Sequence, residues 1–205
     1  MTSKTHFTVG IASAVFLTMP DNFTDLILCL GTAGIGSVIS DVDATTSESK
    51  KALKKVLLFS FFSVLFIYLS DKYLNTNIFS SFRNNATIAR MITGIVMFIT
   101  VCVIGEKCPH RTFMHSLPGT ALTVLSTFVI LPQAAVYMLI SMLSHIVLDL
   151  SNKKKIKILY PLKKPKLGFG LFYADGVANK LFFILGFALS VLLTGMSIYF
   201  CIHNS

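Results

Sequence analysis

The sequence predicts an all-α fold, a polytopic transmembrane helical bundle with about seven membrane segments. Composition supports this prediction, since 54% of the 205 residues are hydrophobic and only 13% are charged. The mean hydropathy of +0.73 is that of a membrane chain rather than of a soluble domain. Apolar runs of membrane length recur from end to end, with no internal repeat or low-complexity linker. We therefore expect one membrane-embedded helical domain, residues 1–205.

Polar residues separate the apolar runs and define the expected membrane segments. In chain order these are Phe7–Met19, Phe23–Ile39, Leu53–Ser70, Ala86–Ile104, Leu117–Leu131, Gln133–Leu150 and Val177–Ile202. The first and fifth are shorter than the roughly 20 residues that a helix needs to cross a bilayer. Either they cross a locally thinned bilayer, which we favour, or they form tilted hairpin partners that do not cross fully.

Short polar signals mark the ends of several segments. Pro20-Asp21-Asn22 and Leu131-Pro132-Gln133 indicate tight turns between antiparallel neighbours. Ser116 followed by Leu117-Pro118 is typical of a helix N-cap with proline in the first turn.

The four cysteines, Cys29, Cys102, Cys108 and Cys201, show no CxxC spacing, and three lie in apolar runs. We expect them to be buried, reduced thiols. Cys108 lies two residues before His110, and metal binding there is the alternative.

The basic residues predict the topology. If all seven segments cross, one side carries the N-terminus, residues 40–52 and 105–116, and a basic loop at residues 151–176. It collects Lys4, Lys50, Lys51, Lys54, Lys55, Lys107, Arg111, Lys153, Lys154, Lys155, Lys157, Lys163, Lys164, Lys166 and Lys180, against Lys72, Arg83 and Arg90 on the other side. By the positive-inside rule the first side, with the N-terminus, is cytoplasmic. The net charge of +9 then reflects cytoplasmic loops, and we expect no nucleic-acid partner.

The histidine and aspartate residues point to the functional site. His145 and Asp149 are four residues apart, so on a helix they share one face, which is costly in lipid unless something pairs with them. The topology brings five more such residues to the same cytoplasmic boundary: His6, Asp41, Asp43, His110 and His115. Of the five histidines, only His203 is excluded. Each residue alone has an ordinary structural or interfacial explanation, but their shared location favours one metal site.

The donor types indicate which metals fit. Imidazole nitrogen and carboxylate oxygen suit zinc, manganese or iron, and a carboxylate-rich site also accepts magnesium. Seven candidate ligands exceed the needs of one four-coordinate ion, so we expect one or two divalent ions, with zinc first and manganese or magnesium as alternatives. A two-metal site suits the hydrolysis of phosphoesters.

The sequence resembles the family of LexA-regulated, membrane-bound metal-dependent hydrolases, also called YdjM-like inner-membrane proteins. The resemblance covers most of the chain in order and rests on Thr5-His6 with Gly10, Gly36-Ser37-Val38-Ile39-Ser40-Asp41-Val42-Asp43, His110-Arg111-Thr112-Phe113-Met114-His115-Ser116, Ser144-His145 with Asp149, and Leu159-Tyr160-Pro161-Leu162. It implies a multi-pass protein of the bacterial inner membrane with a metal-dependent hydrolase site. It also implies that the seven residues above are ligands or catalytic groups.

The chain departs from the family pattern at two places. It has Ile39-Ser40-Asp41 where the family tends to have Leu-Pro-Asp, and Thr112 where the family tends to have glycine. Both changes affect loop rigidity and neither removes a ligand.

These observations favour a membrane-embedded hydrolase that cleaves a phosphoester of an anionic phospholipid or lipid-linked substrate through a metal-activated water. The candidate catalytic groups are Asp43, His115 and Arg111, whose guanidinium can hold an oxyanion. The basic loop, in which lysines alternate with Ile156, Ile158 and Leu162, is expected to contact anionic lipid headgroups. Asp175 is a weaker additional candidate. The alternatives are a metal-ion or small-solute transporter and a lipid-binding scaffold with a structural metal.

Overall fold

The structure, a computed structural model, describes residues 1–44, 51, 53–58, 65, 68–69, 72–73, 85–162, 165–174 and 176–203. The described part of the chain is helical, without a named β-strand, which confirms the predicted all-α class. The named elements are α1 (Ser3–Thr18), α2 (Phe23–Ile39), the 3₁₀ helix η1 (Ser40–Asp43), α5 (Ala86–Lys107), α6 (Leu117–Ile130), α7 (Pro132–Ser151) and α8 (Val177–His203). Half of the predicted third segment, Leu53–Ser70, lies outside the described residues; residues 53–58 are helical.

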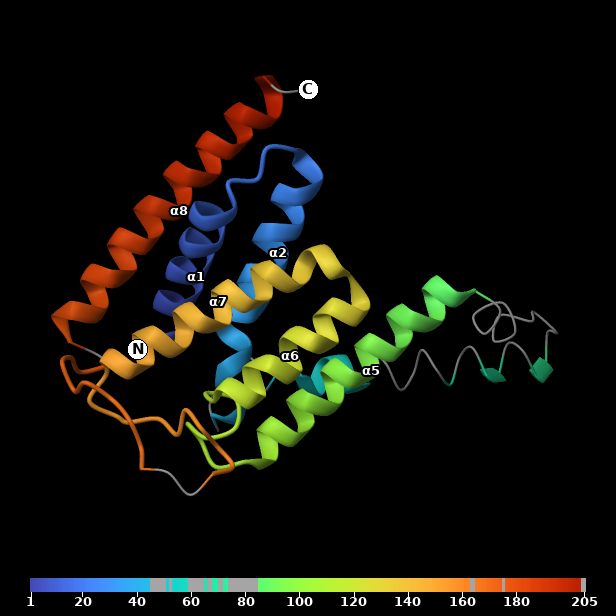
Figure 1. Cartoon of the computed structure of the whole chain (residues 1–205), viewed down its shortest axis with the longest axis horizontal. Helices are drawn as coiled ribbons and strands as arrows, with labels where there is room; N and C mark the ends of the chain where they lie inside the picture. Colours follow the sequence, from blue (N-terminus) through green and yellow to red (C-terminus); the bar gives the residue numbers. More distant parts are fainter. Residues whose placement is uncertain are drawn as a thin grey trace.

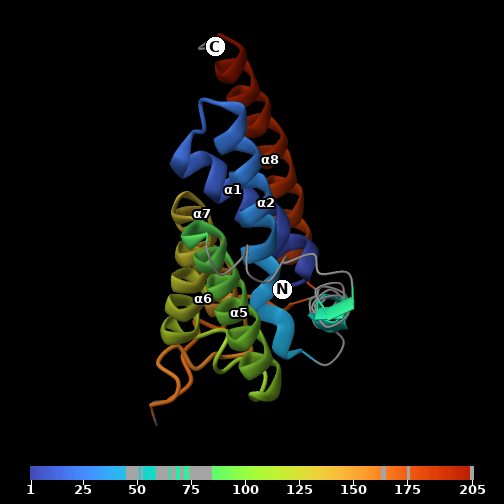
Figure 2. The same ribbon diagram turned by 90° about the vertical axis from the view of Figure 1, so that its right-hand side faces the viewer.

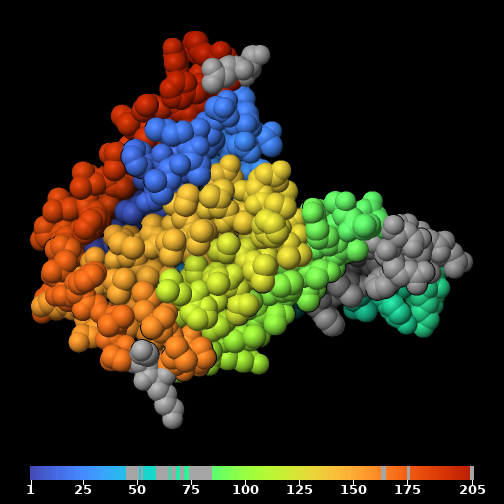
Figure 3. Space-filling view, viewed as in Figure 1, coloured from blue at the N-terminus to red at the C-terminus, as the bar shows by residue number. Residues whose placement is uncertain are grey.

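The consecutive helices joined by short connections, α1 and α2, α5 and α6, and α6 and α7, run antiparallel (Figure 1). Helix α1 packs on α2, α7 and α8; α2 also packs on α7, α7 on α6, and α6 on α5. In the space-filling view α1 appears as a narrow strip between α8 and α7 (Figure 3). The N-terminus, the ends of α2, α5 and α7, and the starts of α6 and α8 gather at one end of the bundle (Figures 1 and 2). This end, which we call the loop end, also holds residues 152–162, 165–174 and 176.

In the part of the chain that the structure describes, four helices are long and apolar enough to span a membrane, in the segments Phe23–Asp43, Ala86–Lys107, Pro132–Ser151 and Val177–His203. Helix α6 is a shorter apolar helix of 14 residues, and α1 has 16 residues. At about 1.5 Å per residue these two are shorter than the roughly 30 Å of hydrocarbon. The predicted shortness of the first and fifth segments is therefore confirmed.

Helix α1 begins at Ser3, four residues before the predicted start at Phe7. The helix starts earlier than predicted because its polar first turn forms hydrogen bonds within the protein. The carbonyl of Thr2 accepts from the backbone N–H groups of Thr5 and His6. Thr5 Oγ1 donates to Asn179 Oδ1 of α8 over 2.9 Å. A segment that a hydropathy pattern assigns to a loop is therefore helix, and His6 lies within it.

The predicted turns and N-cap are confirmed, and the prediction of buried thiols holds for Cys29, Cys102 and Cys201 but not for the half-buried Cys108. Asn22 caps α2 by accepting from the Asp25 N–H, and Ser116 Oγ caps α6 by accepting from the Gly119 N–H over 3.1 Å. Pro132 is the first residue of α7. All four cysteines are free thiols, and three of them are buried.

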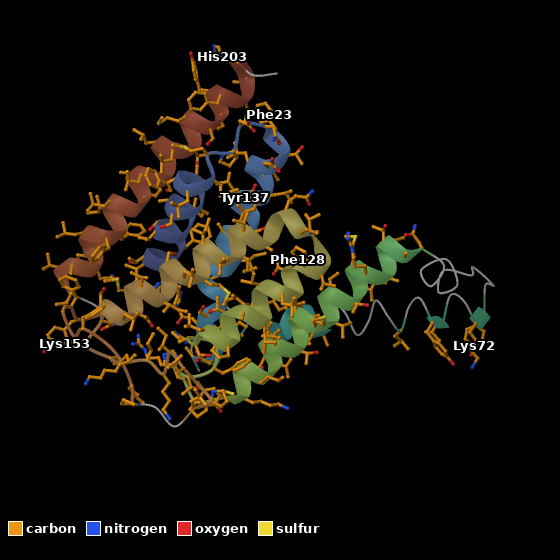
Figure 4. All side chains as sticks on the ribbon, in the orientation of Figure 1. Phe23, Lys72, Phe128, Tyr137, Lys153 and His203 are labelled. Atoms are coloured by element: carbon orange, nitrogen blue, oxygen red, sulfur yellow. The ribbon has the colours of Figure 1, made fainter. Side chains whose placement is uncertain are left out.

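Small residues let α1, α2 and α7 approach closely near the loop end. A Cβ atom placed on Gly36 of α2 would lie 2.1 Å from Ser141 Oγ and 2.8 Å from Met138 Sδ, both on α7. A Cβ atom on Gly10 of α1 would lie 2.4 Å from Ser37 Cβ. Further along the bundle, Tyr137 (labelled in Figure 4) is buried with Ala14, Cys29 and Ala33. These contacts fix the three helices that carry most of the candidate site.

Candidate metal centre

Five of the seven predicted donor residues converge at the loop end. His6 lies on α1, Asp41 on η1, His115 in the loop before α6, and His145 and Asp149 on the last two turns of α7. They form two groups whose donor atoms lie within 4.8 Å of one another: His6, His145 and Asp149, and Asp41, His115 and His145. His145 belongs to both groups, so the two groups form one cluster.

The spacing of the donor atoms differs from that of ordinary hydrogen bonds. His6 Nε2 lies 3.5 Å from Asp149 Oδ1, and His115 Nε2 lies 3.3 Å from Asp149 Oδ2. The Nε2 atoms of His115 and His145 each lie 3.6 Å from Asp41 Oδ1. Hydrogen bonds between nitrogen and oxygen measure about 2.7–3.2 Å. By contrast, two donors that each lie about 2.1 Å from a tetrahedral zinc ion are about 3.4 Å apart.

The tautomer of His145 follows from its other nitrogen. Nδ1 lies 2.7 Å from the backbone carbonyl oxygen of Ser37, which can only accept, so Nδ1 carries the hydrogen. The neutral ring then has a free lone pair on Nε2, the atom that faces Asp41. A carbonyl that holds one ring nitrogen while the other faces a cluster is the usual arrangement of a metal-binding histidine. The ring also stacks on His6, with 3.7 Å between the centroids.

Several polar atoms of the cluster are buried without a hydrogen-bond partner among the described residues. They are His6 Nδ1, both ring nitrogens of His115, His145 Nε2 and Asp149 Oδ2. Buried polar groups are normally paired because an unpaired one costs free energy. A divalent cation would satisfy the inward-facing nitrogen and oxygen atoms together, so the residues present fit such an ion.

Asp43 and His110 lie behind the cluster rather than in it. His110 Nδ1 lies 2.7 Å from Asp43 Oδ1, and the Arg111 backbone N–H donates to Asp43 Oδ2 over 3.0 Å. Asp43 Oδ2 also lies 3.5 Å from His115 Nδ1. The His110 side chain is 43% exposed. Neither residue belongs to the two donor groups, so the structure places them in contact with a donor instead.

Arg111 connects the cluster to the basic loop. Its guanidinium donates to Asp149 Oδ1 over 3.2 Å and to the backbone carbonyl of Lys154, and it forms an ion pair with Asp149 Oδ2 at 3.1 Å. Its Nε is buried without a partner. Its backbone adopts a left-handed conformation, with φ 65°. Such a conformation costs a residue with a Cβ atom about 1–2 kcal/mol. The three hydrogen bonds of Arg111 to Asp43, Asp149 and Lys154 hold the loop in this conformation.

His115 lies in the loop before α6, outside the candidate membrane spans. Burial alone would lower the pKa of His115, but the facing carboxylates of Asp149, Asp41 and Asp43 outweigh burial and raise this pKa well above the usual histidine value. The Arg111 guanidinium and the Met1 ammonium also pair with Asp149, at 3.1 and 3.3 Å, so without a cation the proton on this ring is one of three positive charges that offset the carboxylates.

Sequence reasoning missed two groups that build the site. The Ser37 carbonyl orients His145, and no side-chain pattern marks a backbone acceptor. Asn179 accepts from the Thr2 N–H and from Thr5 Oγ1, which joins the starts of α1 and α8. An amide at the start of an otherwise apolar segment is a signal that could have identified it. Asp175 and the lysines at 163 and 164 lie outside the described residues, so their predicted roles stay predictions.

The fold and the site define a class, a polytopic helical membrane protein with a buried His/Asp cluster at one end of its bundle. The sequence model of the YdjM inner membrane protein family matches residues 1–203, and the chain belongs to this family. The predicted family resemblance and the multi-pass inner-membrane location are thereby confirmed. Neither a curated protein nor a solved structure matches the chain.

Proposed function

We propose that the protein is a metal-dependent hydrolase that cleaves a phosphoester of a phospholipid or lipid-linked substrate at the cytoplasmic face of the inner membrane. The observation that carries this proposal is the buried cluster of imidazole nitrogens and carboxylate oxygens, 3.3–3.6 Å apart, in which several imidazole nitrogens and Asp149 Oδ2 lack a hydrogen-bond partner. This donor set favours zinc, with manganese or magnesium as alternatives. A bound divalent ion would supply Lewis acidity, which activates water and stabilises charge on a phosphoryl oxygen.

The five inward-facing residues would hold the metal: His6, Asp41, His115, His145 and Asp149. The Nε2 of His145 has one lone pair and can bind one ion only. The two oxygens of Asp149 face different histidines, His6 and His115. If two ions bind, Asp149 is therefore the residue that they would share.

Asp43, Arg111 and the Ser37 carbonyl orient these donors. Both oxygens of Asp43 already accept hydrogen bonds, so its role in this proposal is to position His115 rather than to touch the substrate. Arg111 positions Asp149 through its guanidinium and lies at the edge of the cluster, 12% exposed. From there it can also contact a substrate oxyanion.

Asp41 is the carboxylate that we assign to proton transfer. Its side chain is 15% exposed, whereas the side chain of Asp149 is 1% exposed, so Asp41 is at the open edge of the cluster. A general base must reach the water that it deprotonates. Asp41 Oδ1 faces His115 and His145, which would fix the orientation of this carboxylate.

The assignment of the substrate rests on location. The cluster lies at the ends of candidate membrane spans, where a lipid headgroup meets the protein first. The predicted cytoplasmic side is also the basic side, and basic side chains near the membrane attract anionic lipid.

The test is turnover by the purified protein. Phosphatidylglycerol and a soluble phosphodiester would be assayed with zinc, manganese or magnesium, before and after chelation. Turnover is expected with metal, and its loss is expected after chelation and in His145→Gln. His203→Gln is the matched control, because His203 lies at the far end of α8 (Figure 4). Absence of turnover with all three metals, or turnover that survives both chelation and His145→Gln, would contradict the proposal.

A further inference from the structure

Beside the metal centre, a groove opens between the first turns of α1, the end of α2 and the start of α8. Its volume is about 390 Å³, and its lining includes Ser3, Lys4, Phe7, Val38, Phe183 and Phe187. A second hollow of about 360 Å³ shares Lys4 and Phe183 with it and adds Asn179 and Lys180. The shared residues make the two hollows one continuous surface, which we call the α1–α8 groove.

The deeper part of the groove is apolar and lies among membrane segments. Val38 belongs to the candidate span Phe23–Asp43, and Phe183 and Phe187 belong to the span Val177–His203. The rings of Phe183 and Phe187 stack with 6.3 Å between their centroids. At this depth the groove opens among lipid hydrocarbon, so the occupant that can reach it is a lipid chain.

The outer part of the groove is basic. Lys4 and Lys180 are both exposed at its rim, and among the described residues neither forms an ion pair within 4 Å. The helix starts that carry them are held together because Asn179, adjacent to Lys180, accepts hydrogen bonds from the Thr2 N–H and Thr5 Oγ1 at the start of α1. Two ammonium groups above an apolar channel are complementary to a lipid with an anionic headgroup.

The groove borders the metal centre directly. Ser3, which lines it, donates from Oγ to Asp41 Oδ2 over 3.5 Å, and Val38 lies three residues before Asp41. Asp41 is also the donor that is exposed at the edge of the cluster. A headgroup between Lys4 and Lys180 would therefore lie next to the open side of the donor cluster.

We propose that the α1–α8 groove binds one anionic phospholipid of the cytoplasmic leaflet, with its phosphate at Lys4 and Lys180 and an acyl chain along Phe183 and Phe187. This inference rests on the proposed function, because it treats the bound lipid as the substrate that is held for hydrolysis. Lipid binding itself requires neither a metal nor turnover, so the two proposals can fail separately.

The chain contains no tryptophan, so a single introduced tryptophan reports on one position. Phe187→Trp places the reporter in the groove, and Phe200→Trp places a control on the same helix nearer its far end, where Phe200 is 43% exposed. Each variant would be reconstituted with EDTA in equimolar phosphatidylglycerol and phosphatidylcholine. Either the anionic or the zwitterionic lipid would carry bromine, which quenches tryptophan at short range.

Brominated phosphatidylglycerol is expected to quench the tryptophan at 187 more strongly than brominated phosphatidylcholine, and to quench the tryptophan at 200 equally. In the Phe187→Trp background, Lys4→Gln and Lys180→Gln should each lower the preference for the anionic lipid about fivefold. Lys107→Gln, at the same boundary but on α5, should leave the preference unchanged. Equal quenching by the two lipids at 187, or a preference that survives removal of both lysines, would overturn the groove assignment.

A turnover assay separates the two proposals. If chelator-sensitive hydrolysis occurs without a lipid preference at 187, the groove assignment alone fails. If the preference is present and no hydrolysis is found with any of the three metals, the groove stands as a lipid site and the hydrolase proposal fails.

Discussion

The imidazole of His145 on α7 donates from Nδ1 to the backbone carbonyl of Ser37 on α2, over 2.7 Å. Ser37 is among the last four residues of α2, whose carbonyls lack an α-helical partner. A carbonyl at the end of α2 therefore determines which nitrogen of the His145 ring on α7 carries the hydrogen. Because a backbone carbonyl cannot be removed by substitution, the orientation of His145 depends on how closely α2 and α7 pack.

Replacing His145 is expected to abolish tight metal binding. His145→Gln removes the only residue that both donor groups share, so the metal affinity should fall by more than the roughly 100-fold that loss of an outer-shell partner can cause. Elemental analysis of the purified protein and competition with a chelating dye would measure this. His203→Gln should keep the metal content of the unmodified chain. An unchanged metal content in His145→Gln would place the metal elsewhere.

Asp43→Asn tests whether this carboxylate orients His115 or binds the metal itself. An amide keeps the shape of the side chain but loses its charge, so a supporting role predicts a loss of metal affinity of about 10- to 100-fold. Asp41→Asn, which alters a donor of the cluster, should cost more than Asp43→Asn. Asp21→Asn, in the turn between α1 and α2, is the control. Equal losses for Asp41→Asn and Asp43→Asn would mean that Asp43 is a ligand.

The sequence was sufficient to predict the helices and the end of the bundle at which the site lies. Hydropathy locates apolar segments, and charge asymmetry orients them. The alternation of segments then places His6, Asp41 and His145 at one boundary. Each of these inferences depends only on which residues are polar and how far apart they are.

The sequence could not predict which of the seven histidine and aspartate residues belong to the donor groups and which only contact a donor. Asp41 and Asp43 are two residues apart, yet only Asp41 belongs to a donor group, because η1 is a 3₁₀ helix that turns the two side chains in different directions. The backbone contact between Ser37 and His145 depends on the crossing of α2 and α7, which spacing along the chain does not encode. The early start of α1 was missed for a related reason, since the partner of its first turn, Asn179, is distant in sequence.

Metal binding should release a proton from His115. The facing carboxylates raise the pKa of His115 well above that of an unfolded chain, so the metal-free ring is protonated at neutral pH. An ion must displace that proton, and the apparent metal affinity should rise about tenfold per pH unit until the pH passes the raised pKa. Calorimetry in buffers of different ionisation enthalpy would count the released proton. In His115→Gln the release should disappear.

Whereas the metal affinity should rise with pH, the stability of the metal-free protein should fall. A pKa that is raised on folding stabilises the folded state fully below the unfolded pKa of about 6.5, and this contribution is lost as the pH rises through the folded pKa. Thermal unfolding in EDTA should therefore show a stability that decreases above neutral pH. His115→Gln should remove this dependence, and a stability that instead rises in that range would contradict the assignment.

The contact at Gly36 links packing to the metal centre. In Gly36→Ala the new Cβ atom would meet Ser141 Oγ at 2.1 Å, Met138 Sδ at 2.8 Å and the Met138 carbonyl oxygen at 3.3 Å. The two side chains must shift, and the close backbone oxygen favours a small displacement of α2 from α7. Overpacking of this kind typically costs about 1–3 kcal/mol of stability. It should also weaken metal binding, because the Ser37 carbonyl is the next residue along α2. Thermal unfolding and dye competition in the same detergent would measure both effects.

Gly31 provides the matched control on the same helix, because a Cβ atom there would meet nothing within 4 Å. Gly31→Ala should leave metal affinity unchanged and should not lower stability, since alanine is the better helix former. Adding Ser141→Gly to Gly36→Ala removes the nearest colliding atom and should restore part of both the stability and the metal affinity. If Gly36→Ala lowered stability while metal affinity stayed at the level of the Gly31→Ala control, the orientation of His145 would not depend on the approach of α2 to α7.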